Sequence, residues 1–268
     1  MLRRAAVIVV RETLRLTRRP RAAGPVIGPE AAATAEPLRR AVVQSAAPRA
    51  VARWRTRLTS LAVAAGLTVF GLLGWLVSGG QTSAPDLTLT SGVQQAEHPL
   101  LAAVMMLISA PGFPPLNLLV VGGAAAFFWL AGYRTEGAFA ALAGLGAAAL
   151  ASFLKAFWLR PRPDDELVQV IGSAPGTSFP SGHTLFYVGF FGFLFYWVYA
   201  ALRPSRLRTV LLALLGLLVV LVGPSRVYLG HHWSSDVLAA YALGFAYLLV
   251  LIRLYSARRL SSPASATS

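Results

Sequence analysis

Long apolar stretches alternate with short polar or basic segments over most of the chain. Most of them approach the roughly 20 residues that an α-helix needs to cross a bilayer, and one is slightly shorter but wholly apolar. They cover residues 58–77, 116–133, 137–157, 183–202, 208–224 and 237–254. The pattern predicts an all-α, polytopic membrane protein built as a bundle of six transmembrane helices.

A shorter apolar segment runs from Pro99 to Ala110 and is followed by Pro111-Gly112. At about twelve residues it is too short to cross a bilayer, so we expect a short interfacial or re-entrant helix there. Small residues recur within the second and third predicted spans and favour close helix packing. These are Gly122, Gly123, Gly137, Gly144 and Gly146.

The pattern divides the chain into three regions. Residues 1–57 are basic, with a part rich in alanine and proline, and are expected to form a partly disordered cytoplasmic extension whose first residues can lie on a lipid surface as a basic amphipathic helix. Residues 58–254 form the membrane domain, and 255–268 a short cytoplasmic tail.

Composition agrees with a membrane protein. Of the 268 residues 56% are hydrophobic and only 13% are charged, about half the 25% typical of soluble domains. This argues against a cytosolic enzyme and against a disordered chain. The absence of cysteine excludes disulfides, thiolate nucleophiles and cysteine-ligated zinc.

The net charge of +14 comes from basic residues that flank the apolar stretches rather than forming one stripe. We therefore expect the bilayer, not nucleic acid, as the partner of this charge. Both termini lie on the arginine-rich side of a six-span bundle, whereas the loop 78–98 on the other side has no Lys or Arg. The positive-inside rule predicts cytoplasmic termini.

Four basic residues break this rule, because they fall on the extracytoplasmic side: Lys155, Arg160, Arg162 and Arg226. A charge at a membrane edge is costly unless it has a partner. Three of the four belong to short motifs, Lys155-x6-Arg162-Pro163, Pro180-Ser181-Gly182-His183 and Ser225-Arg226-x5-His232-x3-Asp236. Zero or two spans separate these motifs, so they lie on one membrane face.

The residue types in these motifs suit phosphate binding. The guanidinium fork of arginine matches phosphate oxygens, and Lys155, the only lysine, adds a point charge. Ser181, Gly182 and His183 open a span, where free backbone N–H groups and the helix dipole favour an anion.

Two histidines and a carboxylate are candidates for the catalytic groups of a phosphate-transfer reaction. His232 and Asp236 are four residues apart, so a helix beginning near His232 places them on one face. The carboxylate can hold one imidazole nitrogen and leave the other free to attack phosphorus. His183 can then protonate the leaving oxygen as a general acid. Asp164, Asp165 and Glu166 are consecutive and need not converge on magnesium, so we expect neither a metal nor a cofactor.

The three motifs, in this order and spacing, resemble the signature of the type 2 phosphatidic acid phosphatase superfamily, which also contains the vanadium haloperoxidases. The resemblance implies a phosphohistidine mechanism with His232 as nucleophile, Asp236 as its orienting partner and His183 as general acid. The residues implied to bind phosphate are Lys155, Arg162, Ser181, Gly182 and Arg226.

The sequence therefore predicts an integral membrane phosphatase whose active site faces the extracytoplasmic side. By resemblance, its candidate substrates are phosphatidic acid, phosphatidylglycerol phosphate and undecaprenyl diphosphate. A phosphotransferase with the same nucleophile and a non-catalytic lipid-binding protein are the alternatives. For His231 we favour a structural role, and for Arg160 snorkelling to the interface over contact with a second phosphate.

Overall fold

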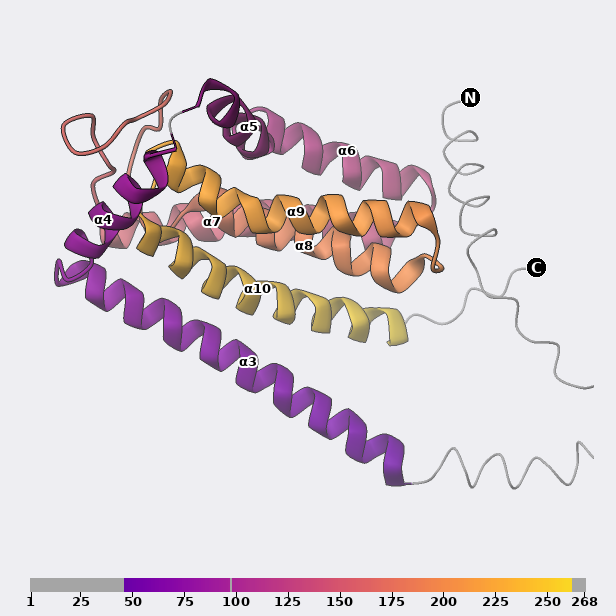
Figure 1. Ribbon diagram of the computed structural model, residues 1–268. Coiled ribbons are helices and arrows are strands. Elements are labelled where there is room, and N and C mark those ends of the chain that lie inside the picture. Colours follow the sequence, from indigo (N-terminus) through magenta and orange to yellow (C-terminus); the bar gives the residue numbers. More distant parts are fainter. Residues whose placement is uncertain (1–45, 97, 262–268) are drawn as a thin grey trace, which may run out of the picture.

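The computed structural model describes residues 46–96 and 98–261, and all regular elements within these ranges are helices (Figure 1). They are α3 (Ala46–Ser78), α4 (Ser83–Gln94), α5 (Pro99–Ser109), the 3-10 helix η1 (Ala110–Gly112), α6 (Leu116–Leu130), α7 (Arg134–Trp158), α8 (Gly182–Ala201), α9 (Arg206–Tyr228) and α10 (Ser234–Ser261). The predicted all-α fold is confirmed.

Five of these helices, α3, α7, α8, α9 and α10, are long and apolar enough to cross a membrane. The sixth predicted span is present as a bent pair, in which α5 with η1 meets α6 at an angle of 55°. The helix α6 has only 15 residues and ends at Leu130, earlier than predicted. The chain reverses there through Gly132, whose φ of +88° ends the helix. The expected short helix at 99–110 is present as one arm of this bent pair, which has the form of a broken span or a re-entrant loop.

The helix α8 lies at the centre of the bundle. In the most apolar 18-residue stretch of α8, 61% of the residues are buried inside the protein, whereas the corresponding value for α3 is 11%. It packs on α7, α9 and α10, and α3 lies outside against α10 (Figure 1). Residues of α8 make up half of the main buried cluster, including Phe186, Phe190 and Phe193. The other helices expose large apolar side chains, as lipid-facing surfaces do.

Two predicted regional boundaries fall inside helices. Residues 46–57, assigned to the N-terminal extension, belong to α3 and continue into the first span. Residues 255–261, assigned to the tail, belong to α10. The rest of the predicted extension, 1–45, and residues 262–268 lie outside the described residues.

The predicted small-residue packing holds for three of the five glycines. A Cβ at Gly137, Gly144 or Gly146 would come within 2.9, 2.3 or 2.5 Å of an atom from a neighbouring helix. Gly122 and Gly123 have nothing within 4 Å of that position. The close contacts of α7 with α6, α8 and α10 depend on its own glycines.

We expect Gly144→Ala to destabilise the protein by about 1–3 kcal/mol, because its methyl group would overlap Val121 of α6 in a packed interior. Gly122→Ala is the matched control. It adds the same atom where no neighbour lies within 4 Å and should be neutral or stabilising, since alanine favours helix. Thermal unfolding in detergent checks both variants, and equal melting temperatures would contradict the packing argument.

Candidate active site

The three sequence motifs meet at one end of the bundle, where α7 and α9 end and α8 and α10 begin (Figure 1). The loop 159–181 and α4 cover this end. Gln94 of α4 joins the pieces, because its Nε2 donates to the carbonyls of Gln169 in the loop (2.7 Å) and Tyr228 in α9 (2.9 Å). Antiparallel helices thus bring together residues that are up to 81 positions apart, from Lys155 to Asp236.

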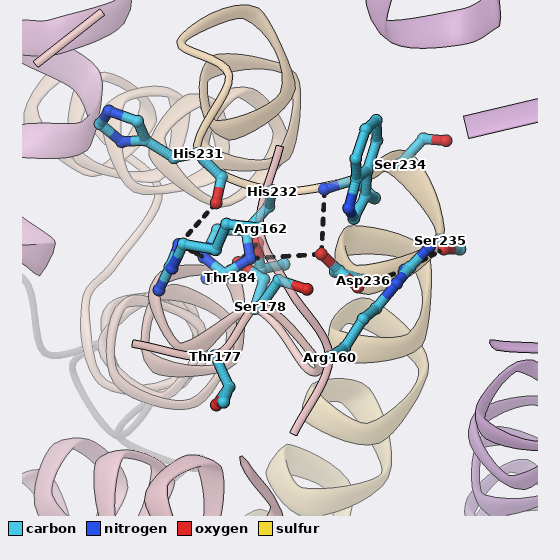
Figure 2. A network of polar contacts seen from close by, with 12 residues as sticks. Arg160, Arg162, Thr177, Ser178, Thr184, His231, His232, Ser234, Ser235 and Asp236 are labelled. Carbon is cyan, nitrogen blue, oxygen red and sulfur yellow. Dashed lines mark hydrogen bonds and ion pairs between the residues drawn. The ribbon is translucent and has the colours of Figure 1, made fainter. Parts of the chain in front are cut away.

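His232 lies in the short turn between α9 and α10, with its side chain 1% exposed. Its Nδ1 is 3.5 Å from Oδ2 of Asp236, in the first turn of α10. Its Nε2 is 3.1 Å from Nη1 of Arg162 (Figure 2). His232 and Asp236 therefore lie side by side as predicted, but Nδ1 has no hydrogen-bond partner within the described residues. The second ring nitrogen faces a cation.

Arg162 and Lys155 are held by backbone carbonyls of nearby loops. Arg162 donates from Nη1 to the carbonyl of His231 (2.5 Å) and from Nε to that of Gly176 (3.0 Å). Lys155 donates from Nζ to the carbonyls of Thr177 and Ser178. Within the described ranges neither forms an ion pair with a carboxylate. Their positive charge therefore remains available to an anion.

Arg226 and His183 have buried side-chain nitrogens that lack partners within the described residues. Arg226 is 1% exposed, and its Nε and Nη1 have no hydrogen-bond partner in the described part of the chain. Nε2 of His183 is also unpartnered. Leaving such groups unsatisfied in an interior is expensive. Their arrangement suits a ligand with several acceptor oxygens.

Burial, followed by the charges of Arg162, Arg226 and Lys155, lowers the pKa of His232 well below its usual range. The imidazole is therefore neutral at pH 7, so one of its two nitrogens carries a lone pair instead of a proton. The cations that produce this effect are those expected to bind phosphate.

The hydrogen bonding of Ser181 differs in part from what the sequence predicts. Its backbone N–H donates to the carbonyl of Asp236 (3.2 Å), and its hydroxyl accepts from Thr184 as the N-cap of α8. The Ser181 amide is therefore engaged, contrary to the expectation of a free N–H. Gly182 and His183 occupy the first turn, whose amides have no intrahelical partner. A Cβ on Gly182 would lie 3.9 Å from Cε of Lys155, so this turn is next to the lysine.

The prediction that Arg160 snorkels to the interface was wrong, because its side chain turns inward to two carboxylates. It is 10% exposed and bridges two buried carboxylates, with Nη1 2.6 Å from Oδ1 of Asp236 and Nη2 2.7 Å from Oδ2 of Asp86. The two acids satisfy a charge that would otherwise be costly at this depth. Asp86 was not among the predicted site residues. The sequence does carry one indication of it, because Asp86 is acidic and the loop 78–98 contains no Lys or Arg to pair with it.

Phe113, between η1 and α6, was also missed. Its ring lies 4.9 Å from the Arg226 guanidinium carbon and 4.5 Å from the ring of His183. The adjoining Gly112 touches His183 so closely that a Cβ there would come within 2.3 Å of its ring. The bend between η1 and α6 therefore forms one wall of the site. No motif marks it in the sequence.

His231 has a structural position. Its Nε2 pairs with the carbonyl of Ile171 at 2.8 Å and ties the turn before α10 to the loop 159–181. Within the described ranges, no group of three or more His, Cys, Asp or Glu side chains is placed to hold a metal ion.

Residues 137–260, which include most of α7 to α10 and the cluster of cations and histidines, match the PAP2 superfamily. This part of the chain is a PAP2 superfamily domain. The matched range contains every predicted site residue.

Among curated relatives, the chain is 32% identical over 131 residues to phosphatidylglycerophosphatase B of Bacillus subtilis (strain 168). The match covers 48% of this chain and 62% of the relative, so it spans less than two thirds of that protein. Among solved structures, the fold is similar to the crystal structure of a transmembrane PAP2 type phosphatidylglycerolphosphate phosphatase from Bacillus subtilis. The TM-score is 0.62 at 24% identity, covering 72% of this chain and 96% of that one.

The tie made by His231 predicts a pH dependence of stability. Burial, followed by the charge of Arg226, lowers its pKa from 6.5 to about 4. The unfolded chain therefore binds a proton that the folded protein does not, and stability falls as the pH drops from 6.5 towards about 4. In His231→Gln the amide can still donate to Ile171 but does not titrate. We expect a smaller loss of melting temperature between pH 7 and pH 5 than in the wild type. The same loss in both proteins would contradict this assignment.

Proposed function

We propose that the protein is a membrane lipid phosphate phosphatase that works through a phosphohistidine on His232. The observation that carries the proposal is a neutral, buried imidazole with Nδ1 beside Asp236 and Nε2 beside Arg162. The unpartnered donors of Arg226 and the unpartnered Nε2 of His183 surround the same place.

In the first step, Nε2 of His232 attacks phosphorus and the bond from phosphorus to the lipid oxygen breaks. His183 donates a proton to the departing oxygen. Lys155, Arg162 and Arg226 stabilise the charge on the equatorial oxygens, together with the first-turn amides of Gly182 and His183. In the second step, water attacks the phosphohistidine, gives a proton to His183 and releases inorganic phosphate as the N–P bond breaks.

The role of Asp236 follows from its contact with Nδ1. A carboxylate there holds the tautomer that carries the proton on Nδ1, and it stabilises the positive ring of the phosphohistidine. Arg162 donates towards Nε2 in the structure, which indicates that the lone pair of this nitrogen points to the place where phosphate would bind.

We propose a site on the extracytoplasmic side, with both termini cytoplasmic, because the basic residues outside the site flank the opposite ends of the spans. The substrate class is a lipid phosphomonoester or diphosphate. The name of the Bacillus subtilis relative makes phosphatidylglycerol phosphate the first substrate to test, with phosphatidic acid and undecaprenyl diphosphate beside it.

We expect purified protein in detergent to release phosphate from at least one of these lipids, and His232→Ala to abolish release while the protein still folds. His98→Ala is the matched control, because His98 is exposed and its side chain accepts a hydrogen bond from the backbone N–H of Leu100 at the start of α5. Full activity of His232→Ala would refute the nucleophile. A phosphorylated acceptor lipid in place of free phosphate would identify a phosphotransferase. Binding of these lipids with neither product would indicate a non-catalytic protein.

Turnover should be unchanged in excess EDTA, because Lys155, Arg162 and Arg226 supply the positive charge that a metal ion supplies in other phosphatases. The measurement compares rates before and after chelation. Activity lost in EDTA and restored by added magnesium would refute the metal-independent mechanism.

A further inference from the structure

We propose that Asp86 and Arg160 are positioning residues that fix the carboxylate of Asp236 and, through it, the ring of His232. This inference rests on the proposed phosphatase function. Neither residue is one of the positions that define the three sequence motifs; Arg160 is an unspecified position between Lys155 and Arg162. In the described part of the structure, the hydrogen bonds of both residues go to partners other than His183 and the cations expected to bind phosphate.

The two oxygens of Asp236 are held by different partners. Oδ1 accepts from Nη1 of Arg160 at 2.6 Å. Oδ2 accepts from the backbone N–H of Trp233 at 2.9 Å and lies 3.5 Å from Nδ1 of His232 (Figure 2). With Oδ1 fixed by the guanidinium, the carboxylate cannot rotate without losing a charge-assisted hydrogen bond, so Oδ2 stays directed at the imidazole.

Arg160 is in turn fixed by partners on α4 and α10. Its Nη2 donates to Oδ2 of Asp86 (2.7 Å) and to Oγ1 of Thr82 (3.0 Å). Its Nη1 also donates to Oγ of Ser235 (2.8 Å). A planar guanidinium held at both nitrogens has one orientation, which a lysine could not reproduce.

Asp86 connects this arginine to the start of α10. Its Oδ1 accepts from the hydroxyl of Ser234 (2.6 Å) and the backbone N–H of Ser235 (2.8 Å), and its Oδ2 accepts from the hydroxyl of Ser235 (2.6 Å). Burial would raise the pKa of Asp86, but the bonds from these serines and Arg160 lower it below its usual value. A charged carboxylate of α4 therefore caps the helix that carries Asp236.

The electrostatic balance also assigns Arg160 to positioning. Its single positive charge lies between two carboxylates, whereas Lys155 and Arg162 have no carboxylate partner within the described ranges. A cation neutralised in this way attracts a phosphate little. Loss of Arg160 should therefore affect the bond-breaking step more than substrate binding.

The test is steady-state kinetics of Arg160→Gln, Arg160→Lys and Asp86→Asn on phosphatidylglycerol phosphate and phosphatidic acid in detergent micelles. We expect Arg160→Gln to lower kcat by about 10- to 100-fold, the scale of a misplaced reacting group. KM and inhibition by inorganic phosphate should be unchanged. Arg160→Lys and Asp86→Asn should lose less. Arg253→Gln, at an exposed arginine on α10, is the control for removal of one positive charge.

A purely structural role would give a different result. It would lower the melting temperature and raise KM and the inhibition constant for phosphate together with the fall in kcat. Should Arg160→Gln fail to fold, Asp86→Asn carries the same comparison. Positioning through Asp236 also predicts that Arg160→Gln causes no further loss in an Asp236→Asn background, measured with a radiolabelled lipid. Additive losses would overturn the proposal.

The proposed function and the positioning role of Arg160 can be refuted separately. If the wild type shows His232-dependent turnover and Arg160→Gln keeps the wild-type kcat, only the positioning proposal is refuted. If the wild type shows no His232-dependent turnover on any of these lipids, the proposed function and the positioning proposal both fail.

Discussion

The placement of four positive side chains at one edge of an apolar bundle is the constraint on which the site depends. Each charge needs compensation at this depth, and the protein uses two kinds. Arg160 lies between two carboxylates. Lys155 and Arg162 are held by uncharged carbonyls, and Arg226 lies against Phe113 with donors unpaired. One of the four cations is therefore paired with carboxylates inside the protein, and the other three have no carboxylate partner within the described residues.

Helix ends are what bring these cations together. The motifs lie where α7 and α9 end and where α8 and α10 begin, so the rigid parts of four helices set the positions of the reacting groups. The loop 159–181 adds the carbonyls that direct Lys155 and Arg162. Ser181 shows how tightly these parts are joined, because one residue caps α8 and also donates its amide to the carbonyl of Asp236.

The lengths of the apolar stretches predicted the membrane helices, and the even number of spans between the motifs predicted that the motifs share one membrane face. Each of these features can be read from a local segment of the sequence. The helix α4 escaped them because Ser83–Gln94 is polar and contains Pro85 and Gly92, which are typical of a loop. The ion pair between Asp86 and Arg160 joins residues 74 positions apart, and Phe113 reaches the site at the bend between η1 and α6. Such contacts depend on tertiary packing, so they cannot be predicted from the spacing of residues along the sequence.

The carbonyls that hold Lys155 and Arg162 have a consequence for the environment in which the protein can work. A carboxylate loses its charge when its surroundings become acidic, and an ion pair built on it then weakens. A backbone carbonyl does not titrate, and burial together with the neighbouring cations keeps the imidazole of His232 neutral well below its usual pKa. Lys155, Arg162 and the imidazole of His232 are therefore expected to keep the same charge state when the medium is acidified.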